Sequence, residues 1–399
     1  AAAAFFFVLT TLLFLDFTGT LHAWFGWMAK IQFLPALLAL NVGVVAFLVI
    51  LTLLFGRVYC SVICPLGVMQ DIVSWASGKR RKHRNRFAYS PALTWLRRGM
   101  LVVFVAAMLA GVGSLLAPYS AYGRIASNLL APVYAWGNNL LAYIAGRMDS
   151  YAFYSVDVWM KSLSTLLVAV VTFAVLFVLA WRSGRTYCNT ICPVGTVLGF
   201  LARYSLFKPR FDTSKCNGCK LCARNCKASC IDPAAHKIDY SRCVACMDCL
   251  ENCRQGAITY TLRRRKPDPA PAPQRPAADA AKTPSDASRR RFLGLAGIVA
   301  YSALRAQEKK VDGGLAVIVD KKIPNRATPV VPPGAQSLRH FNAHCTGCQL
   351  CVSVCPNQVL RPSTKLSTLM QPEMSYERGY CRPECTKCSE VCPAGAILK

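Results

Sequence analysis

The chain has 399 residues, of which 54% are hydrophobic and only 17% are charged, so a large part of it must be buried in lipid or in an extensive core. Its net charge of +28 is unevenly placed: residues 56–98 hold nine Lys or Arg and one acid, whereas residues 118–161 hold three and two. This asymmetry is what the positive-inside rule predicts for cytoplasmic and exported loops. Because the basic run has no interleaved aromatic residues, we expect no nucleic acid partner.

Four long apolar stretches follow one another in the first half of the chain. Each is close to the roughly 20 residues that a helix needs to cross the hydrocarbon layer of a membrane. The stretches cover residues 1–18, 34–55, 99–117 and 162–181. We therefore expect an α-helical membrane domain over residues 1–203, with about four spans in membrane lipid and its basic loop on the cytoplasmic side.

A twelve-residue box occurs twice in this predicted domain. GRVYCSVICPLG (box one, residues 56–67) ends the second apolar stretch, and GRTYCNTICPVG (box two, residues 184–195) ends the fourth, which indicates a parallel internal repeat. The spacing of four should place both cysteines of a box on one face of a helix. The four thiols predict a site for iron, zinc or cuprous copper, a cluster, or a thiol redox centre; the alternative is a helix break at the proline with buried thiols. The four cysteines are Cys60, Cys64, Cys188 and Cys192.

Residues 204–262 carry two runs of the pattern Cys-x2-Cys-x2-Cys-x3-Cys. In bacterial ferredoxins the first three cysteines of a run hold one 4Fe–4S cluster and the fourth reaches to the other cluster. We expect a cytoplasmic α+β module with two clusters. The predicted ligands are Cys216, Cys219, Cys222 and Cys253 for cluster one, and Cys243, Cys246, Cys249 and Cys226 for cluster two. An extra cysteine, Cys230, is either a bystander thiol or a replacement for Cys226.

The next segment changes composition twice. Residues 263–288 hold six prolines among Ala, Asp and Ser, which predicts an extended, mobile linker. SRRRFLGLAG (residues 288–297) then looks like a twin-arginine export signal with Arg289 and Arg290 as the export pair. The apolar stretch after it is short for a span, so we expect residues 289–305 to be a signal-like segment or a marginal fifth anchor.

Residues 306–399 contain a second double array and are expected to form a second module with two 4Fe–4S clusters, exported if the twin-arginine segment works. Zinc sites need pairs of Cys-x2-Cys rather than triplets with a trailing fourth cysteine, and disulfide frameworks do not repeat these triplets. The predicted ligands are Cys345, Cys348, Cys351 and Cys392 for cluster three, and Cys381, Cys385, Cys388 and Cys355 for cluster four.

Other redox cofactors find little support in the sequence. There are five histidines and only His22 is near a predicted span, which argues against a transmembrane b-type haem. Cys-x-x-Cys-His and GxGxxG motifs are absent, which argues against c-type haem, NADH and flavin. Asp16, His22 and Trp24 could approach a quinone head group at the exported interface. The alternative is an aromatic interfacial anchor beside a solvated Asp16.

Residues 5–262 resemble the NapH-type membrane ferredoxin subunits, which are related to the NosR and CcoG polyferredoxins, in their spans, boxes and double cluster motif. From Arg289 onward the chain resembles the NapG-type exported ferredoxins. This second likeness rests on SRRRFLGLAG, VPPGA (residues 331–335), HCTGCQLCVSVCP (residues 344–356) and CRPECTKCSEVCP (residues 381–393). Two departures stand out: NapG-type proteins carry four clusters where this chain has motifs for two, and the flavin-attachment domain of the NosR family is absent.

The resemblance implies a fusion of two redox subunits in the cytoplasmic membrane. It implies oxidation of menaquinol and electron delivery to an exported reductase or cytochrome in anaerobic respiration. We therefore expect a quinol dehydrogenase component that exchanges electrons with an exported redox partner. Two alternatives remain open: a cytoplasmic polyferredoxin that reduces copper, and an electron-wiring subunit without a substrate site.

Overall fold

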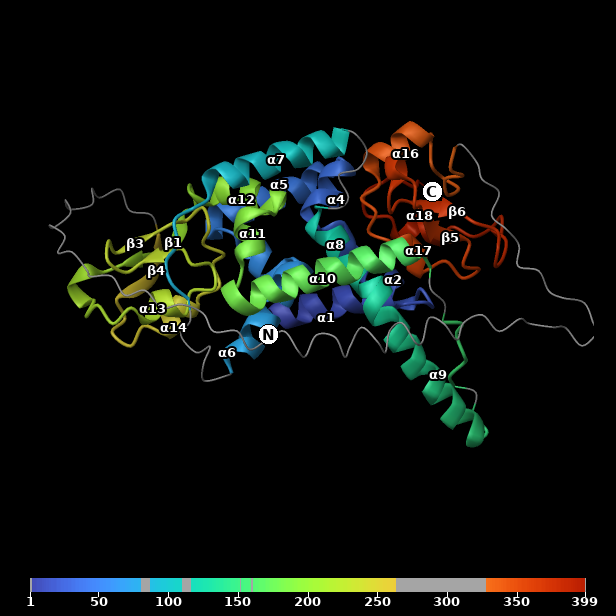
Figure 1. Cartoon of the computed structure of the whole chain (residues 1–399), viewed down its shortest axis with the longest axis horizontal. Coiled ribbons are helices and arrows are strands. Elements are labelled where there is room, and N and C mark those ends of the chain that lie inside the picture. Colours follow the sequence, from blue (N-terminus) through green and yellow to red (C-terminus); the bar gives the residue numbers. More distant parts are fainter. Residues whose placement is uncertain are drawn as a thin grey trace, which may run out of the picture. The chain divides into compact units, whose positions relative to one another are not determined.

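The computed structural model describes residues 2–79, 87–109, 116–150, 152–158, 161–262 and 328–398 (Figure 1). A helical domain takes up the chain as far as Ala202, and two small α+β modules follow it. The predicted linker at residues 263–288 and the predicted export segment at residues 289–305 lie outside the described residues.

The helical domain begins with two longer helices and three short ones. Its first elements are α1 (Ala2–Leu15), α2 (Thr20–Phe25), α3 (Trp27–Lys30), α4 (Phe33–Leu38) and α5 (Val42–Phe55). The second predicted span is therefore two helices. Leu40 has a φ of 52° and interrupts the helix, and the side chain of Asn41 then caps α5 by accepting a hydrogen bond from the Val44 amide.

The middle of the domain surrounds a buried helix. The elements are a π-helical turn at Tyr59–Ile63, α6 (Pro65–Gly78), α7 (Thr94–Leu109), α8 (Pro118–Ile125), a second π-helical turn at Ala126–Leu130 and α9 (Ala131–Arg147). Every residue of α8 is buried. It packs against α6 and against α10 (Leu163–Ser183). The domain ends with α11 (Thr186–Thr190) and α12 (Pro193–Ala202).

Among the described residues, α10 is the one helix long and apolar enough to cross a membrane. It has 21 residues, whereas α1 and α5 have 14 each and α12 has 10. The prediction of four spans is therefore not confirmed. At 1.5 Å per residue α10 is about 30 Å long.

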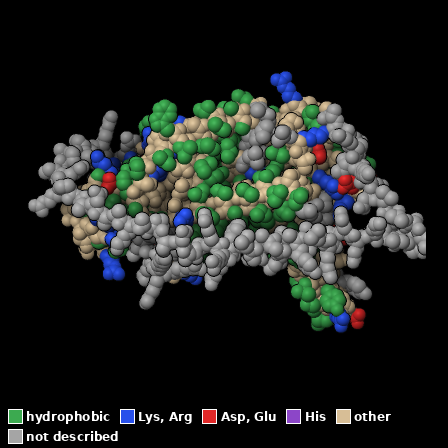
Figure 2. All heavy atoms as spheres, in the orientation of Figure 1, with side chains coloured by type: hydrophobic (Ala, Val, Ile, Leu, Met, Phe, Trp, Pro, Cys, Tyr) green, Lys and Arg blue, Asp and Glu red, His purple; other side chains and the backbone are tan. Residues whose placement is uncertain are grey.

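A broad apolar surface covers the helical domain. α5, α7 and α10 all expose large hydrophobic side chains, and Figure 2 shows such side chains gathered over α7 and α10. Examples are Phe47, Ile50, Val102, Val103, Val105, Leu167, Val171, Val175 and Val178. A contiguous exposed surface of this kind is unusual in a protein surrounded by water, and it marks an interaction with lipid or with another protein.

The first module is built from short strands and single-turn helices. β1 (Phe207–Phe211) pairs antiparallel with β4 (Ile258–Leu262), with Phe207 opposite Leu262. β2 (Ile231–Asp232) pairs with β3 (Lys237–Ile238). The helices α13 (Leu221–Arg224) and α14 (Asp248–Glu251) each follow a loop that contains cysteines.

The second module has the same kind of architecture. Its helices are α16 (Leu338–His344), α17 (Leu350–Ser353) and α18 (Lys387–Val391). β5 (Leu360–Pro362) pairs antiparallel with β6 (Pro372–Met374). The fold is thus helical up to Ala202 and α+β in both modules.

The two modules contact opposite ends of the same helices. Phe55, at the end of α5, accepts a hydrogen bond from the Tyr260 hydroxyl of the first module at 3.0 Å. At the other end, Ala39 packs on Gly395 of the second module: a Cβ atom at Gly395 would lie 3.7 Å from the Ala39 Cα. α10 repeats this arrangement, because Lys161 interacts electrostatically with cysteines of the second module and the Arg185 amide donates to the Lys227 carbonyl at 2.9 Å. The helical domain therefore separates the modules by about the length of α10.

Candidate redox sites

Each of the four predicted cluster sets lies around a cavity of its own. The cysteines predicted for cluster one line one cavity, and those predicted for cluster two line a second. Both cavities are in the first module. The sets from clusters three and four line two further cavities in the second module. In every case the fourth cysteine comes from the other run, as the ferredoxin pattern predicts. The structure thus gathers the residues of each predicted set, and their role as ligands stays a prediction.

The loops around these cavities have an unusual backbone in common. Lys220, Met247 and Gln349 stand two residues before the third cysteine of their runs and have φ values of 60°, 65° and 65°. A residue other than glycine in the left-handed region costs free energy, so such positions persist where the surrounding structure requires them. The run that starts at Cys381 is one residue longer and lacks this feature at Thr386, where φ is −108°.

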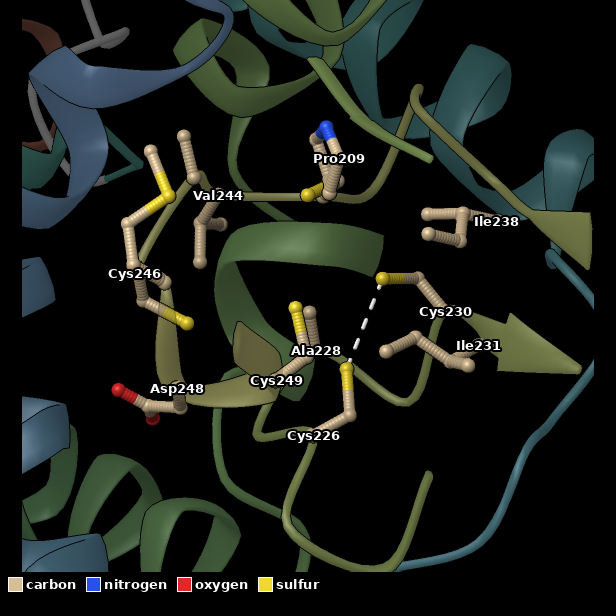
Figure 3. A pocket seen from close by; sticks show the side chains of 13 residues that line it. Pro209, Cys226, Ala228, Cys230, Ile231, Ile238, Val244, Cys246, Asp248 and Cys249 are labelled. Atoms are coloured by element: carbon tan, nitrogen blue, oxygen red, sulfur yellow. Dashed lines mark hydrogen bonds between the residues drawn. The ribbon is translucent and has the colours of Figure 1, made fainter. Parts of the chain in front are cut away.

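The cavity of cluster two has a fifth cysteine. Cys230 lines it, is buried, and has its Sγ 3.6 Å from the Sγ of Cys226 (Figure 3). The hydrogen bond from Cys230 lowers the pKa of Cys226 to about 7, although burial opposes this, and the same bond raises the pKa of Cys230. This polarity favours Cys226 as the thiolate and Cys230 as its hydrogen-bond donor. Both sulfurs are close enough to the cavity to be ligands.

The box cysteines do not share a helix face, which corrects the prediction from their spacing. Cys60 lies in a π-helical turn and Cys188 in α11, whereas Cys64 and Cys192 have extended backbones and cap α6 and α12. The cause is the proline that follows the second cysteine of each box, since proline disfavours the helical conformation of the preceding residue and is favoured at the first position of a helix. All four thiols are nevertheless buried, each with 5% of its surface exposed.

The two boxes are joined by reciprocal arginine contacts. Arg57 of box one donates from Nη2 to the carbonyl of Cys188 at 3.1 Å. Arg185 of box two donates from Nη1 to the carbonyl of Cys60 at 2.6 Å. Glycine is required beside both carbonyls: a Cβ at Gly67 would lie 2.2 Å from the Cys60 oxygen, and one at Gly195 would lie 2.2 Å from the Cys188 oxygen. The sequence repeat therefore forms a pseudo-symmetric pair in space.

The two arginines are both fully buried but are neutralised differently. Asp71 accepts from Nε and Nη2 of Arg185 at 2.7 and 2.6 Å, and it also pairs with Lys227 at 3.2 Å. Burial raises the pKa of Asp71, but Arg185 and Lys227 together lower it by more, so the pKa lies below its usual value. Arg57 forms no ion pair with a carboxylate among the described residues; its oxygen partners are the Asn189 side chain and the carbonyls of Ser241 and Cys188.

A second buried group lies at the end of α1. The Asp16 carboxylate accepts from the Thr18 hydroxyl at 2.7 Å and contacts Nδ1 of His22 at 3.2 Å. The side chains of Asp16 and His22 are 3% and 7% exposed, and Nε2 of His22 is buried with no hydrogen-bond partner. The predicted companion Trp24 is 80% exposed instead. Asp16 is therefore not a solvated carboxylate, which corrects that alternative.

Two domain families match the chain. The family described as a 4Fe–4S binding domain matches residues 37–83 and 165–214, which contain the two boxes. The family described as a 4Fe–4S dicluster domain matches residues 344–396, which contain the cysteines of clusters three and four. The chain carries 4Fe–4S domains of the ferredoxin type. No solved structure matches it.

Curated relatives of the chain include two proteins that are named as ferredoxin-type. The chain is 29% identical over 195 residues to the ferredoxin-type protein NapH of Escherichia coli, which covers 48% of this chain and 55% of that protein. It is 28% identical over 172 residues to the methylamine utilization ferredoxin-type protein MauN of Paracoccus denitrificans, with 43% and 48% covered. An uncharacterised protein of Methanocaldococcus jannaschii is 25% identical over 214 residues, with 53% and 68% covered. The chain thus spans about half the length of NapH and MauN.

Sequence reasoning missed the residues that surround the boxes. Arg57 and Arg185 occupy the same place in both copies, so the repeat itself held a signal for them. Asp71 carried no such signal, because its partner Arg185 is far away in the sequence.

Proposed function

We propose that this protein is a membrane-bound iron–sulfur electron-transfer protein that exchanges electrons between the two faces of a membrane through four 4Fe–4S clusters. The observation that carries this proposal is the contact of the two modules with opposite ends of α5 and α10. A protein that only stored or passed electrons on one side of a membrane would not need to hold its two modules apart.

Several features support a membrane around the helical domain. The length of α10, about 30 Å, equals the thickness of the hydrocarbon layer. α5, α7 and α10 expose apolar side chains. Phe87, the residue that follows the basic run in the sequence, lies at the end that bears the first module, because its amide donates to the Arg224 carbonyl at 3.1 Å. By the positive-inside rule the first module is cytoplasmic, and the second module is then periplasmic, as the twin-arginine segment also predicts.

The relation to NapH supports a role in a respiratory redox complex. We infer that the chain joins a NapH-like part, related to the NosR and CcoG polyferredoxins, to a NapG-like exported module. Its partners are then the quinone pool and an exported reductase or cytochrome.

The Asp16–His22 pair supports quinol as the electron donor. It adjoins the second module, because Lys387 of α18 donates from Nζ to the Thr18 carbonyl at 3.2 Å. Oxidation of one menaquinol releases two electrons and two protons. Nε2 of His22, held in place by Asp16 through Nδ1, would accept the first proton and water the second. The cysteine sets of clusters four and three would hold the one-electron acceptors for the two electrons. A neutral imidazole can accept a proton at one ring nitrogen while the other is held by a carboxylate, so a histidine is suited to this task.

The test is anaerobic reduction of the full-length protein in lipid vesicles by a menaquinol analogue, followed by electron paramagnetic resonance of the reduced clusters. We expect quinol to reduce the clusters in the parent and to reduce them much more slowly in His22→Gln, with dithionite still reducing both. Reduction by dithionite but not by quinol in the parent would leave an electron-wiring subunit. Reduction of added Cu(II) as the main activity would support the copper reductase alternative.

A further inference from the structure

We propose that Cys60, Cys64, Cys188 and Cys192 hold a fifth iron–sulfur cluster, shared between the two boxes, which relays electrons between clusters two and three. This inference rests on the proposed function for the identity of the electron path. It goes beyond that function, which assigns clusters only to the two modules.

The donor set is suited to such a cluster. Four cysteines from two symmetric copies, all buried, give the four thiolates that a cubane needs. No three His, Cys, Asp or Glu side chains in the described part of the chain come close enough to hold a single metal ion. The sixteen module cysteines, which surround cavities, likewise form no site for a single metal ion. A zinc ion would require its sulfur ligands to lie about 2.3 Å from one centre. The box thiols thus resemble the module thiols, for which the sequence predicts 4Fe–4S clusters, in lacking the arrangement of a single-ion site.

Hydrogen-bond donors point at the box sulfurs as they do in the modules. The Gly195 amide donates to the Cys192 sulfur at 3.3 Å, and Nε2 of Gln70 donates to the Cys188 sulfur at 3.3 Å. In the first module the Ala257 amide makes the corresponding bond to the Cys253 sulfur at 3.2 Å. Such bonds stabilise thiolate ligands and tune cluster potential.

The local charge requires an anion. Arg57 is fully buried and forms no ion pair with a carboxylate among the described residues, while its Nη2 lies 3.7 Å from the Cys60 sulfur. A buried guanidinium without a compensating charge is strongly destabilising. A cluster with four thiolate ligands is anionic and would supply that charge. Arg185 needs no such compensation, because Asp71 already pairs with it.

The box site is connected to a cluster site on either side. Toward the first module, Nη1 of Arg57 donates to the Ser241 carbonyl at 3.2 Å, two residues before Cys243 of cluster two. Toward the second module, the hydroxyl of buried Tyr187 donates to the Leu116 carbonyl at 3.3 Å just before α8, and the Asn128 side chain just after α8 donates to the Gln349 side chain, next to Cys348 of cluster three, at 3.0 Å. A centre at the boxes thus divides the gap between the modules into two shorter steps.

Each relay step is a one-electron exchange. One cluster is oxidised by one electron as its neighbour is reduced by one, and no bond forms or breaks and no proton moves. The buried arginines favour the more negative, reduced state of the box cluster.

The test is the iron and acid-labile sulfide content of the full-length protein, purified anaerobically in detergent. Five clusters require about 20 iron atoms per chain, and four clusters require about 16. We expect the parent to hold about 20. The double variant Cys64→Ala/Cys192→Ala should lose about one fifth of the iron and keep the resonance signals of both modules, and the control Cys381→Ser should instead lose signal from the second module.

A parent with about 16 iron atoms and unchanged iron in the double variant would overturn the fifth cluster and leave the proposed function standing. A parent with clearly fewer than about 16 would instead contradict the four module clusters. If the double variant does not fold, the stoichiometry of the parent alone decides. Disulfides found between the box cysteines in the anaerobic protein would also refute the proposal.

Discussion

Replacing Asp71 by asparagine should destabilise the protein markedly. Asp71 bonds twice to Arg185, whose side chain is fully buried, and is itself 19% exposed. Asparagine preserves the shape but removes the charge, so the guanidinium between the two boxes is left without a neutralising partner. Removing one member of a buried ion pair costs about 3–5 kcal/mol. Because Asp71 is partly exposed, we expect the lower end, about 3 kcal/mol.

The matched control is Asp248→Asn. Asp248 pairs with Lys227 at 3.1 Å, and both side chains are partly exposed. Such a pair contributes about 0–1 kcal/mol. Thermal unfolding in detergent should therefore show a midpoint lowered by about 6–12 °C for Asp71→Asn, taking about 2–4 °C per kcal/mol, and by no more than about 4 °C for the control. Equal shifts in the two variants would refute the role of Asp71.

The pH dependence gives an independent check. The pKa of Asp71 is lower in the folded chain than its usual value. Its contribution to stability is therefore complete above the unfolded pKa of about 3.9 and is lost as the pH falls from there through the folded pKa. Asp71→Asn should thus remove part of the loss of stability seen below about pH 4, and an unchanged acid profile would contradict the pairing.

Three further predictions concern the cysteines and glycines. Cys243→Ala should abolish the resonance signal of cluster two and spare the second module; full retention of iron would refute this ligand assignment. Cys226→Ser should keep most of the iron of cluster two, because the Cys230 sulfur lies 3.6 Å from the Cys226 sulfur and can replace it as a ligand. The double variant Cys226→Ser/Cys230→Ser should lose about four iron atoms. Equal iron loss in the single and double variants would contradict this. Gly67→Ala should lower the free energy of unfolding by about 1–3 kcal/mol, because its Cβ would clash with the Cys60 carbonyl. In the same helix, a Cβ at Gly78 meets nothing within 4 Å, so Gly78→Ala should be neutral or stabilising. Thermal unfolding of the two variants measures the difference.

The sequence predicted the grouping of the module cysteines because their spacing is set by local loop geometry. Three runs share the same left-handed residue before the third cysteine, so the pattern and the backbone agree. The second predicted span, by contrast, is broken at Leu40, since hydropathy alone says nothing of backbone dihedrals. The helix-face rule failed at the boxes because Pro65 and Pro193 each begin a new helix, as the alternative of a helix break with buried thiols had predicted.

Long-range contacts account for most of what sequence reasoning left out. Arg185 and Asp71 are 114 positions apart, and Arg57 and Cys188 are 131 apart. No local pattern predicts such pairs. The interior position of α8 was equally hidden, because its Tyr, Ser and Arg residues are also common at membrane interfaces.

The proposed electron transfer requires the two modules to lie on opposite sides of a membrane. The most direct measurement is protease accessibility, in spheroplasts, of an epitope fused after the C-terminal residue, with Arg289→Lys/Arg290→Lys as the control for export. We predict cleavage in the parent and protection in the control. Protection in both, with cleavage after lysis, would place all clusters in the cytoplasm and would contradict electron transfer across the membrane.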